Sequence, residues 1–192
     1  MAFIHKTASL VPSKLELLTA WLPQQSWYVD TGAAPHLTRA GGFRLDDPDG
    51  EVGIEFFFVT DEADGIGTTY HVPMSYRGAP LRDAEDALIG AGQHDALGPR
   101  FVYDGVHDPV VLAAIRALVE GRAQPQHQTE SNTPDPTVQV RRAAGSEVDT
   151  TGVQVLHVLS AGSDVRDGAA WVEASWRRPD GSEQHGPVIV KG

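Results

Sequence analysis

Residues 36–76 read HLTRAGGFRLDDPDGEVGIEFFFVTDEADGIGTTYHVPMSY, and this stretch decides the fold. It holds three strand-like runs, at residues 36–45, 52–60 and 68–76, separated by two segments rich in the Asp, Gly and Pro residues that turns require. Short turns reverse the chain between neighbouring strands. The stretch therefore predicts an antiparallel meander.

The middle run is apolar on both of its faces. Ile54, Phe56 and Phe58 alternate along one face, while Phe57 and Val59 lie on the other. A strand that is buried on both sides belongs in the centre of its sheet. We therefore expect a helix to cover one face of this strand.

Two helices are predicted on either side of the meander in sequence. Residues 12–22 carry leucines at helical spacing, which form one apolar stripe. Residues 109–120 follow Asp108, a good N-cap, begin with a proline and stop before Gly121, which suits a helix C-terminus.

The last third of the chain has a different character. Residues 123–136 lose apolar periodicity and are rich in Pro, Gln and Thr, which predicts a linker. Short strand-like runs follow it, at residues 137–142, 153–160, 170–178 and 187–191.

These elements predict an α+β fold, with a curved antiparallel sheet packed against helices and a small C-terminal β appendix. The expected division is a first domain at 1–122, a linker at 123–136 and an appendix at 137–192. The appendix either extends the first sheet or forms a lobe of its own.

Composition excludes several classes of function. With 26 acidic and 15 basic side chains, the formal charge of −11 disfavours nucleic acid and anionic lipid as partners. The absence of cysteine excludes disulfides and thiol chemistry. No apolar run is long enough for a membrane span and the N-terminus lacks a secretion-signal pattern, so we expect a cytoplasmic protein.

One group of polar residues has the composition of a metal site or a general base: His71, His94, Asp104, His107 and Asp108. Its spacing does not match common metal motifs, because the pairs at i, i+3 and i, i+4, Asp104–His107 and Asp104–Asp108, do not fall within a helix. The stretch that ends at Asp108 reads as a strand exit leading into a helix cap. We expect no catalytic residue, no metal and no cofactor.

A ligand-binding surface is a further hypothesis. Arg77 is suited to clamp a carboxylate or phosphate, or alternatively to pair with Glu85 or Asp86 just downstream. Trp171 and Trp176 fall on opposite faces of one strand, so one of these indoles is expected in the core and the other exposed enough to stack on a sugar. The residues proposed to contact a ligand are Tyr70, Tyr76, Arg77 and Trp171.

Several runs in the first two thirds of the chain are more specific than any single motif: residues 41–46 (GGFRLD), 70–81 (YHVPMSYRGAPL), 87–90 (ALIG) and 101–109 (FVYDGVHDP). Over residues 1–122 the chain resembles the N-terminal cap domain of actinobacterial maltokinases and aminosugar kinases. The resemblance implies a cystatin-like curved sheet that sits on the kinase N-terminal lobe and supplies no catalytic residue.

The resemblance and the residues leave three functions open. The first is a non-catalytic interaction or regulatory module whose partner is a sugar kinase or a trehalose or α-glucan enzyme, because the chain lacks the catalytic elements of a kinase. The second is a small-ligand protein that binds a sugar or sugar phosphate. The third is an enzyme built on His71, Asp104 and His107. An unpaired sheet edge in the appendix would favour a homodimer.

Overall fold

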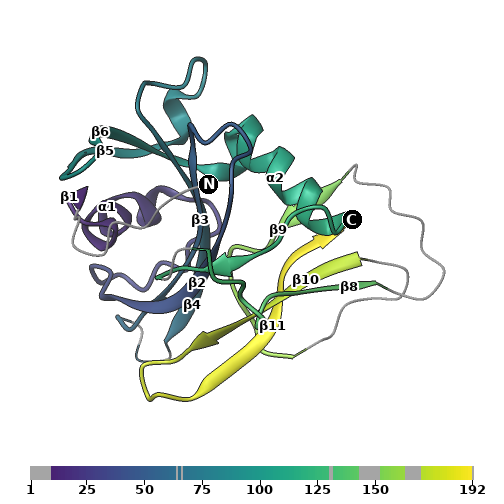
Figure 1. The fold of residues 1–192 in the computed structure, drawn as a ribbon. Helices are drawn as coiled ribbons and strands as arrows, with labels where there is room; N and C mark the ends of the chain where they lie inside the picture. The colour runs from purple at the N-terminus through teal and green to yellow at the C-terminus, as the bar shows by residue number, and fades with distance from the viewer. Residues whose placement is uncertain are drawn as a thin grey trace.

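A computed structural model of the chain describes residues 10–63, 65, 67–129, 132–142, 152–162 and 170–191. These residues form two antiparallel sheets and two α-helices, arranged around the long strands at the centre of Figure 1. The α+β class expected from the sequence is confirmed.

The larger sheet has seven strands in the order β1-β5-β6-β4-β3-β2-β7. Strand β3 lies inside this sheet between β4 and β2 and is buried along both faces, as the apolar alternation predicted. The strands are β1 (Leu10–Val11), β2 (Leu37–Leu45), β3 (Gly53–Asp61), β4 (Thr68–Arg77), β5 (Leu88–His94), β6 (Gly98–Asp104) and β7 (Gln126–His127).

Helix α1 (Lys14–Trp21) covers one face of this sheet (Figure 1). Ser13 and Glu16 form a capping box, in which each side chain accepts a hydrogen bond from the other residue's backbone N–H. Leu18, from the predicted stripe, is fully buried and belongs to the same cluster as Phe57 and Val59 of β3. The predicted helix over one face of the central strand is therefore present.

The opposite face packs against α2 (Pro109–Val119) and the smaller sheet. That sheet has the order β8-β10-β11-β9, with β8 (Gln139–Arg142), β9 (Val153–Val155), β10 (Ala170–Arg177) and β11 (Glu183–Lys191). One continuous apolar cluster holds Phe56 and Phe58 of β3, Ile115 of α2 and both Val172 and Ile189 of the smaller sheet. The smaller sheet thus shares the core of the larger one.

Residues 153–159 connect the two sheets by hydrogen bonds. Their first part is β9, which pairs with β11. Farther on, the backbone N–H of Leu159 donates to the carbonyl of Thr69 at 2.9 Å, and that of His71 donates to the carbonyl of His157 at 2.9 Å. Since β6 pairs only with the C-terminal end of β4, this segment occupies the edge that the N-terminal end of β4 would otherwise leave open.

The three strands of the predicted meander are confirmed, with ends that differ from the prediction by a single residue. Strands β1 and β5 were not predicted, because β1 is very short and β5 contains Gly90 and Gly92, which have low strand propensity. Two residues of the predicted linker form β7 and pair with β2. The division of the chain into domains stays a prediction.

His71 on β4 is fully buried, and it makes an edge contact with the ring of Phe58 at 5.0 Å between centroids. Burial, together with the nearby His157, lowers the pKa of His71 to about 3. The folded state therefore keeps this ring neutral, while the unfolded chain takes up a proton near pH 6.5. Stability that depends on neutral His71 is complete above pH 6.5 and declines as the pH falls toward 3.

We expect the pH dependence of unfolding to change in His71→Gln. Between pH 7 and pH 5, wild-type protein should lose about 2 kcal/mol more of its free energy of unfolding than the variant does. Urea titrations of both proteins at each pH measure this difference. Burial raises the pKa of Asp104, so the contribution of Asp104 to stability changes with pH in the opposite direction. Both proteins contain Asp104, and its contribution therefore cancels in the comparison. Identical pH profiles for the two proteins would contradict the assignment to His71.

Candidate functional site

The residues predicted to bind a ligand lie in four separate places. Arg77 ends β4 and forms two hydrogen bonds with Asp108, from Nε to Oδ2 and from Nη2 to Oδ1, each at 2.7 Å. Asp108 is fully buried and also caps α2 by accepting from the N–H of Val110 at 2.9 Å. The ion-pair alternative is therefore correct for Arg77, but its predicted partners, Glu85 and Asp86, are wrong, because the start of α2 packs against the end of β4.

Tyr70 lies in an aromatic cluster between α1 and the sheet. Its side chain is fully buried, its ring stacks on Tyr28 at 5.5 Å, and its hydroxyl accepts from the N–H of Val29 at 3.1 Å. Trp27 lies beside it and stacks on His157 at 4.3 Å. This cluster attaches the segment after α1 to the sheet.

Trp171 and Trp176 take different environments on β10, as the alternation predicted. Trp176 is buried in the shared core. Trp171 is half-buried, and its indole N–H donates to Glu173 Oε1 at 2.9 Å. Glu173 also accepts from Arg141 Nε at 3.0 Å, so its carboxylate joins neighbouring side chains on one face of the smaller sheet.

Tyr76 belongs to a polar network around Glu55 of β3. The carboxylate of Glu55 accepts from the hydroxyl of Tyr76 at 2.6 Å and from Gln128 Nε2 at 2.7 Å. The ammonium of Lys14 contacts both carboxylate oxygens, at 2.7 and 2.6 Å. Gln128 in turn accepts from the guanidinium of Arg39 through Oε1.

Lys14, Arg39, Glu55 and Gln128 of this network line a pocket of about 300 Å³ at the start of α1. The side chain of Glu55 is only 6% exposed and forms the pocket floor, whereas that of Lys14 is 38% exposed. The pocket lining includes Lys14, Arg39, Glu55, Phe57, Gln128 and Thr129. We call this the Glu55 pocket.

Electrostatics keep Glu55 ionised. Burial alone would raise the pKa of this carboxyl, but the Lys14 ammonium and the hydrogen bonds from Lys14, Tyr76 and Gln128 hold its pKa below the ordinary value. Burial, together with the charge of this carboxylate and its hydrogen bond, raises the pKa of Tyr76 well above its usual range, so that hydroxyl stays protonated. The network therefore consists of one anion and its donors at neutral pH.

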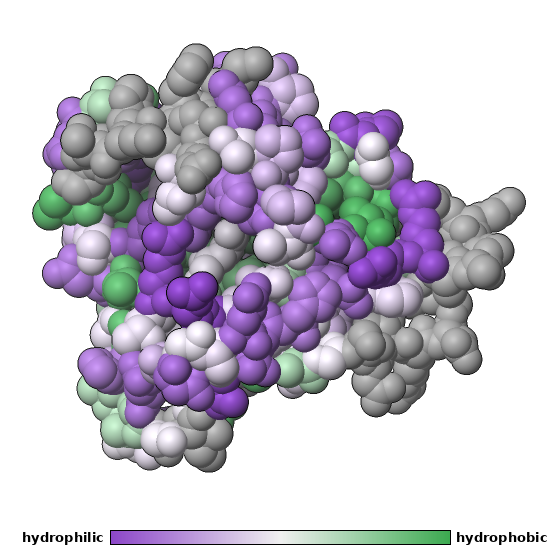
Figure 2. Space-filling view, turned by 60° about the horizontal axis from the view of Figure 1, so that its bottom comes forward, coloured by the Kyte–Doolittle hydropathy of each residue, from purple (hydrophilic) through white to green (hydrophobic). Residues whose placement is uncertain are grey.

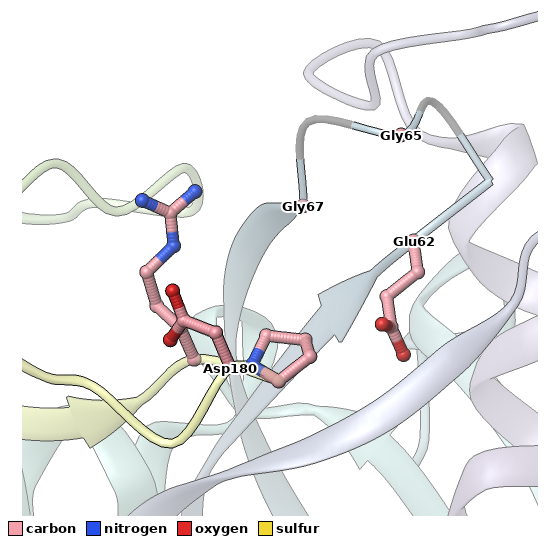
Figure 3. Close-up of a pocket in the computed structure, with 6 residues that line it drawn as sticks. Glu62, Gly65, Gly67 and Asp180 are labelled. Carbon is pink, nitrogen blue, oxygen red and sulfur yellow. The ribbon is translucent and has the colours of Figure 1, made fainter.

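A second depression, of about 520 Å³, lies between the β3–β4 turn and the β10–β11 turn (Figure 3). Glu62 and Asp180 come from these two different turns and lie apart in this view. Asp180 already accepts hydrogen bonds from the backbone N–H and the hydroxyl of Ser182, as turn residues commonly do. The carboxylate of Asp180 is thus used within its own turn, and we do not assign a binding site to the space between these two turns.

The histidines and aspartates considered for metal or base chemistry do not converge. His71 lies in the core, Asp104 accepts from the N–H of Val106, and Asp108 pairs with Arg77. Across the ranges described above, no group of three or more His, Cys, Asp or Glu side chains is placed to hold a metal ion. In the same ranges, no helix has the length and apolar character that a membrane span requires.

Lys14, Arg39 and Gln128 were not predicted as site residues. The bonds from Lys14 and Gln128 to Glu55 join residues 41 and 73 positions apart in the chain. No local motif signals such distant contacts. Only folding of α1 and β7 onto the sheet brings these donors to one carboxylate.

Comparison with known protein families finds a match to one family model. Residues 21–108 match the model of the maltokinase N-terminal cap domain, which confirms the resemblance predicted from the sequence. The match is shorter than half of the 192-residue chain and runs from the end of α1 through β2 to β6, up to the N-cap of α2. No match was found among curated proteins.

Proposed function

We propose that this protein is a non-catalytic module that binds and regulates a sugar kinase of the maltokinase type. The observation that carries the proposal is the match of residues 21–108 to a kinase cap domain. In the kinases that this segment resembles, the cap sits on the N-terminal lobe and supplies no catalytic residue. The module would act in the cytoplasm, on a partner in α-glucan or trehalose metabolism.

In the described part of the chain, the hydrogen bonds of the buried charged residues support a structural role for these residues and not a catalytic one. Arg77 and Asp108 satisfy each other, Asp104 caps a turn, and Glu55 is held by its own donors. The arrangement of α1 over the curved sheet agrees with the cystatin-like packing that we propose for the cap segment.

The face of the protein shown in Figure 2 has the polarity of a modest, reversible interface. Figure 2 shows a face on which hydrophilic residues predominate and hydrophobic residues gather in small, separate areas. Obligate interfaces are usually larger and more apolar. We therefore expect a complex that forms and dissociates readily rather than a permanent one.

Binding of the purified protein to a maltokinase from the same organism tests the proposal. We expect saturable binding in biolayer interferometry, and stronger binding to a kinase from which its own cap has been removed, because the vacated N-terminal lobe becomes accessible. An unrelated protein of similar acidic charge serves as the control. Absence of binding to both kinase forms would overturn the proposal, as would ATP-dependent phosphorylation of maltose by this protein alone.

A further inference from the structure

The carboxylate of Glu55 has no remaining capacity to accept hydrogen bonds. A carboxylate offers about four lone-pair positions. Lys14 contacts both oxygens, Tyr76 contacts Oε2, and Gln128 contacts Oε1. The floor of the Glu55 pocket therefore presents no free acceptor to an incoming molecule.

The charged groups that remain above this floor are donors. The Lys14 side chain is 38% exposed, and its ammonium uses two of its three N–H groups on Glu55, which leaves one for a ligand. Arg39 is exposed and uses Nε and Nη2 on Gln128, which leaves other N–H groups of its guanidinium for a ligand. Thr129 adds a hydroxyl to the lining.

The charge of the pocket is opposite to that of the protein. Among the described residues that line it, Lys14 and Arg39 are cationic and Glu55 is the one anion, so the local charge is positive in a chain of formal charge −11. The chain as a whole repels anions, and binding of an anion to this protein therefore requires a specific cationic site.

We propose that the Glu55 pocket binds a small oxyanion of the phosphate class, either free phosphate or a phosphate monoester. Arg39 and Lys14 donate to the anion, and Glu55 serves to orient Lys14 and Gln128 from below. Leu15 and Phe57 supply an apolar wall for the carbon skeleton of a monoester. The volume of about 300 Å³ lies at the lower end of the range for small-molecule sites.

Isothermal titration calorimetry at constant ionic strength tests the site with inorganic phosphate, glucose 1-phosphate and glucose as probes. We expect phosphate and glucose 1-phosphate to bind, and uncharged glucose not to bind. Tighter binding of glucose 1-phosphate assigns the site to a monoester, and equal affinities assign it to free phosphate; both results support the oxyanion site. Absence of binding by both anions overturns it.

Variants of Arg39 separate this site from general charge effects. We expect Arg39→Gln to weaken binding of the anion about tenfold, which is the effect of losing one charge-assisted hydrogen bond. Arg39→Lys keeps the charge and should retain most of the affinity. Arg82→Gln is the matched control, because Arg82 is exposed, lies outside the pocket and changes the net charge equally. Equal affinity in Arg39→Gln and Arg82→Gln overturns the proposal.

Discussion

Asp108→Ala is expected to lower the free energy of unfolding by about 4 kcal/mol. Two losses contribute to this effect. The fully buried carboxylate of Asp108 is the partner of Arg77, whose side chain is only 19% exposed, and removing it leaves a largely buried cation unpaired. The same substitution removes the hydrogen bond to Val110 and thus the N-cap of α2. Urea denaturation at pH 7 measures the change.

Two further variants separate the contributions of charge and cap. Asp108→Asn retains a good capping side chain but loses the charge, so its loss should be smaller, about 2 to 3 kcal/mol. Asp86→Ala removes an exposed acidic residue that the sequence had suggested as a partner of Arg77, and it should change stability by less than about 0.5 kcal/mol. A loss in Asp86→Ala as large as that in Asp108→Ala would contradict the assignment of Asp108 as the particular partner of Arg77.

The pKa of Asp108 adds a pH dependence to this result. Burial alone would raise this pKa, but the hydrogen bonds and charge of Arg77 help to hold it below the ordinary value. The contribution of Asp108 to stability is therefore complete at neutral pH and is lost only as the pH falls below about 3.8 toward the folded-state pKa. The wild-type advantage over Asp108→Ala should be constant between pH 5 and pH 7.

Phe56→Ala is expected to cost about 4 kcal/mol. Phe56 is fully buried at the centre of β3, and its ring stacks on that of Phe43 with centroids 4.4 Å apart. It belongs to the apolar cluster that includes α2 and both sheets. Truncation therefore leaves a cavity that the surrounding elements cannot easily close.

Calorimetry on Phe56→Ala also tests how the two sheets depend on each other. Because both sheets share the core around Phe56, we expect a single unfolding transition at a lower temperature. Phe101→Ala, which truncates the same side chain at a half-buried position on β6, should cost about 1 to 2 kcal/mol. Two separate transitions would mean that the smaller sheet folds independently. A loss no larger than that of Phe101→Ala would mean that Phe56 does not hold the shared core together.

Whether the sequence predicted a residue's contact correctly depends on how many positions separate the two partners in the chain. The role of Asp108 as N-cap is local, and the sequence predicted it correctly. The partner of Arg77 lies 31 positions away, and the prediction chose a nearer carboxylate instead. One of Trp171 and Trp176 was expected to be exposed enough to stack on a sugar; Trp171 is half-buried, and its indole is already hydrogen-bonded to Glu173.

The sequence by itself determined the central meander, both helices and the cap-domain resemblance, because strand alternation, helix caps and turn residues act over a few positions. Only the tertiary structure decided that residues 153–159 join the two sheets and that Lys14, Arg39 and Gln128 meet around Glu55. These contacts arise when distant segments pack on one core. Buried polar groups there must find partners, and which segment supplies a partner depends on the whole fold.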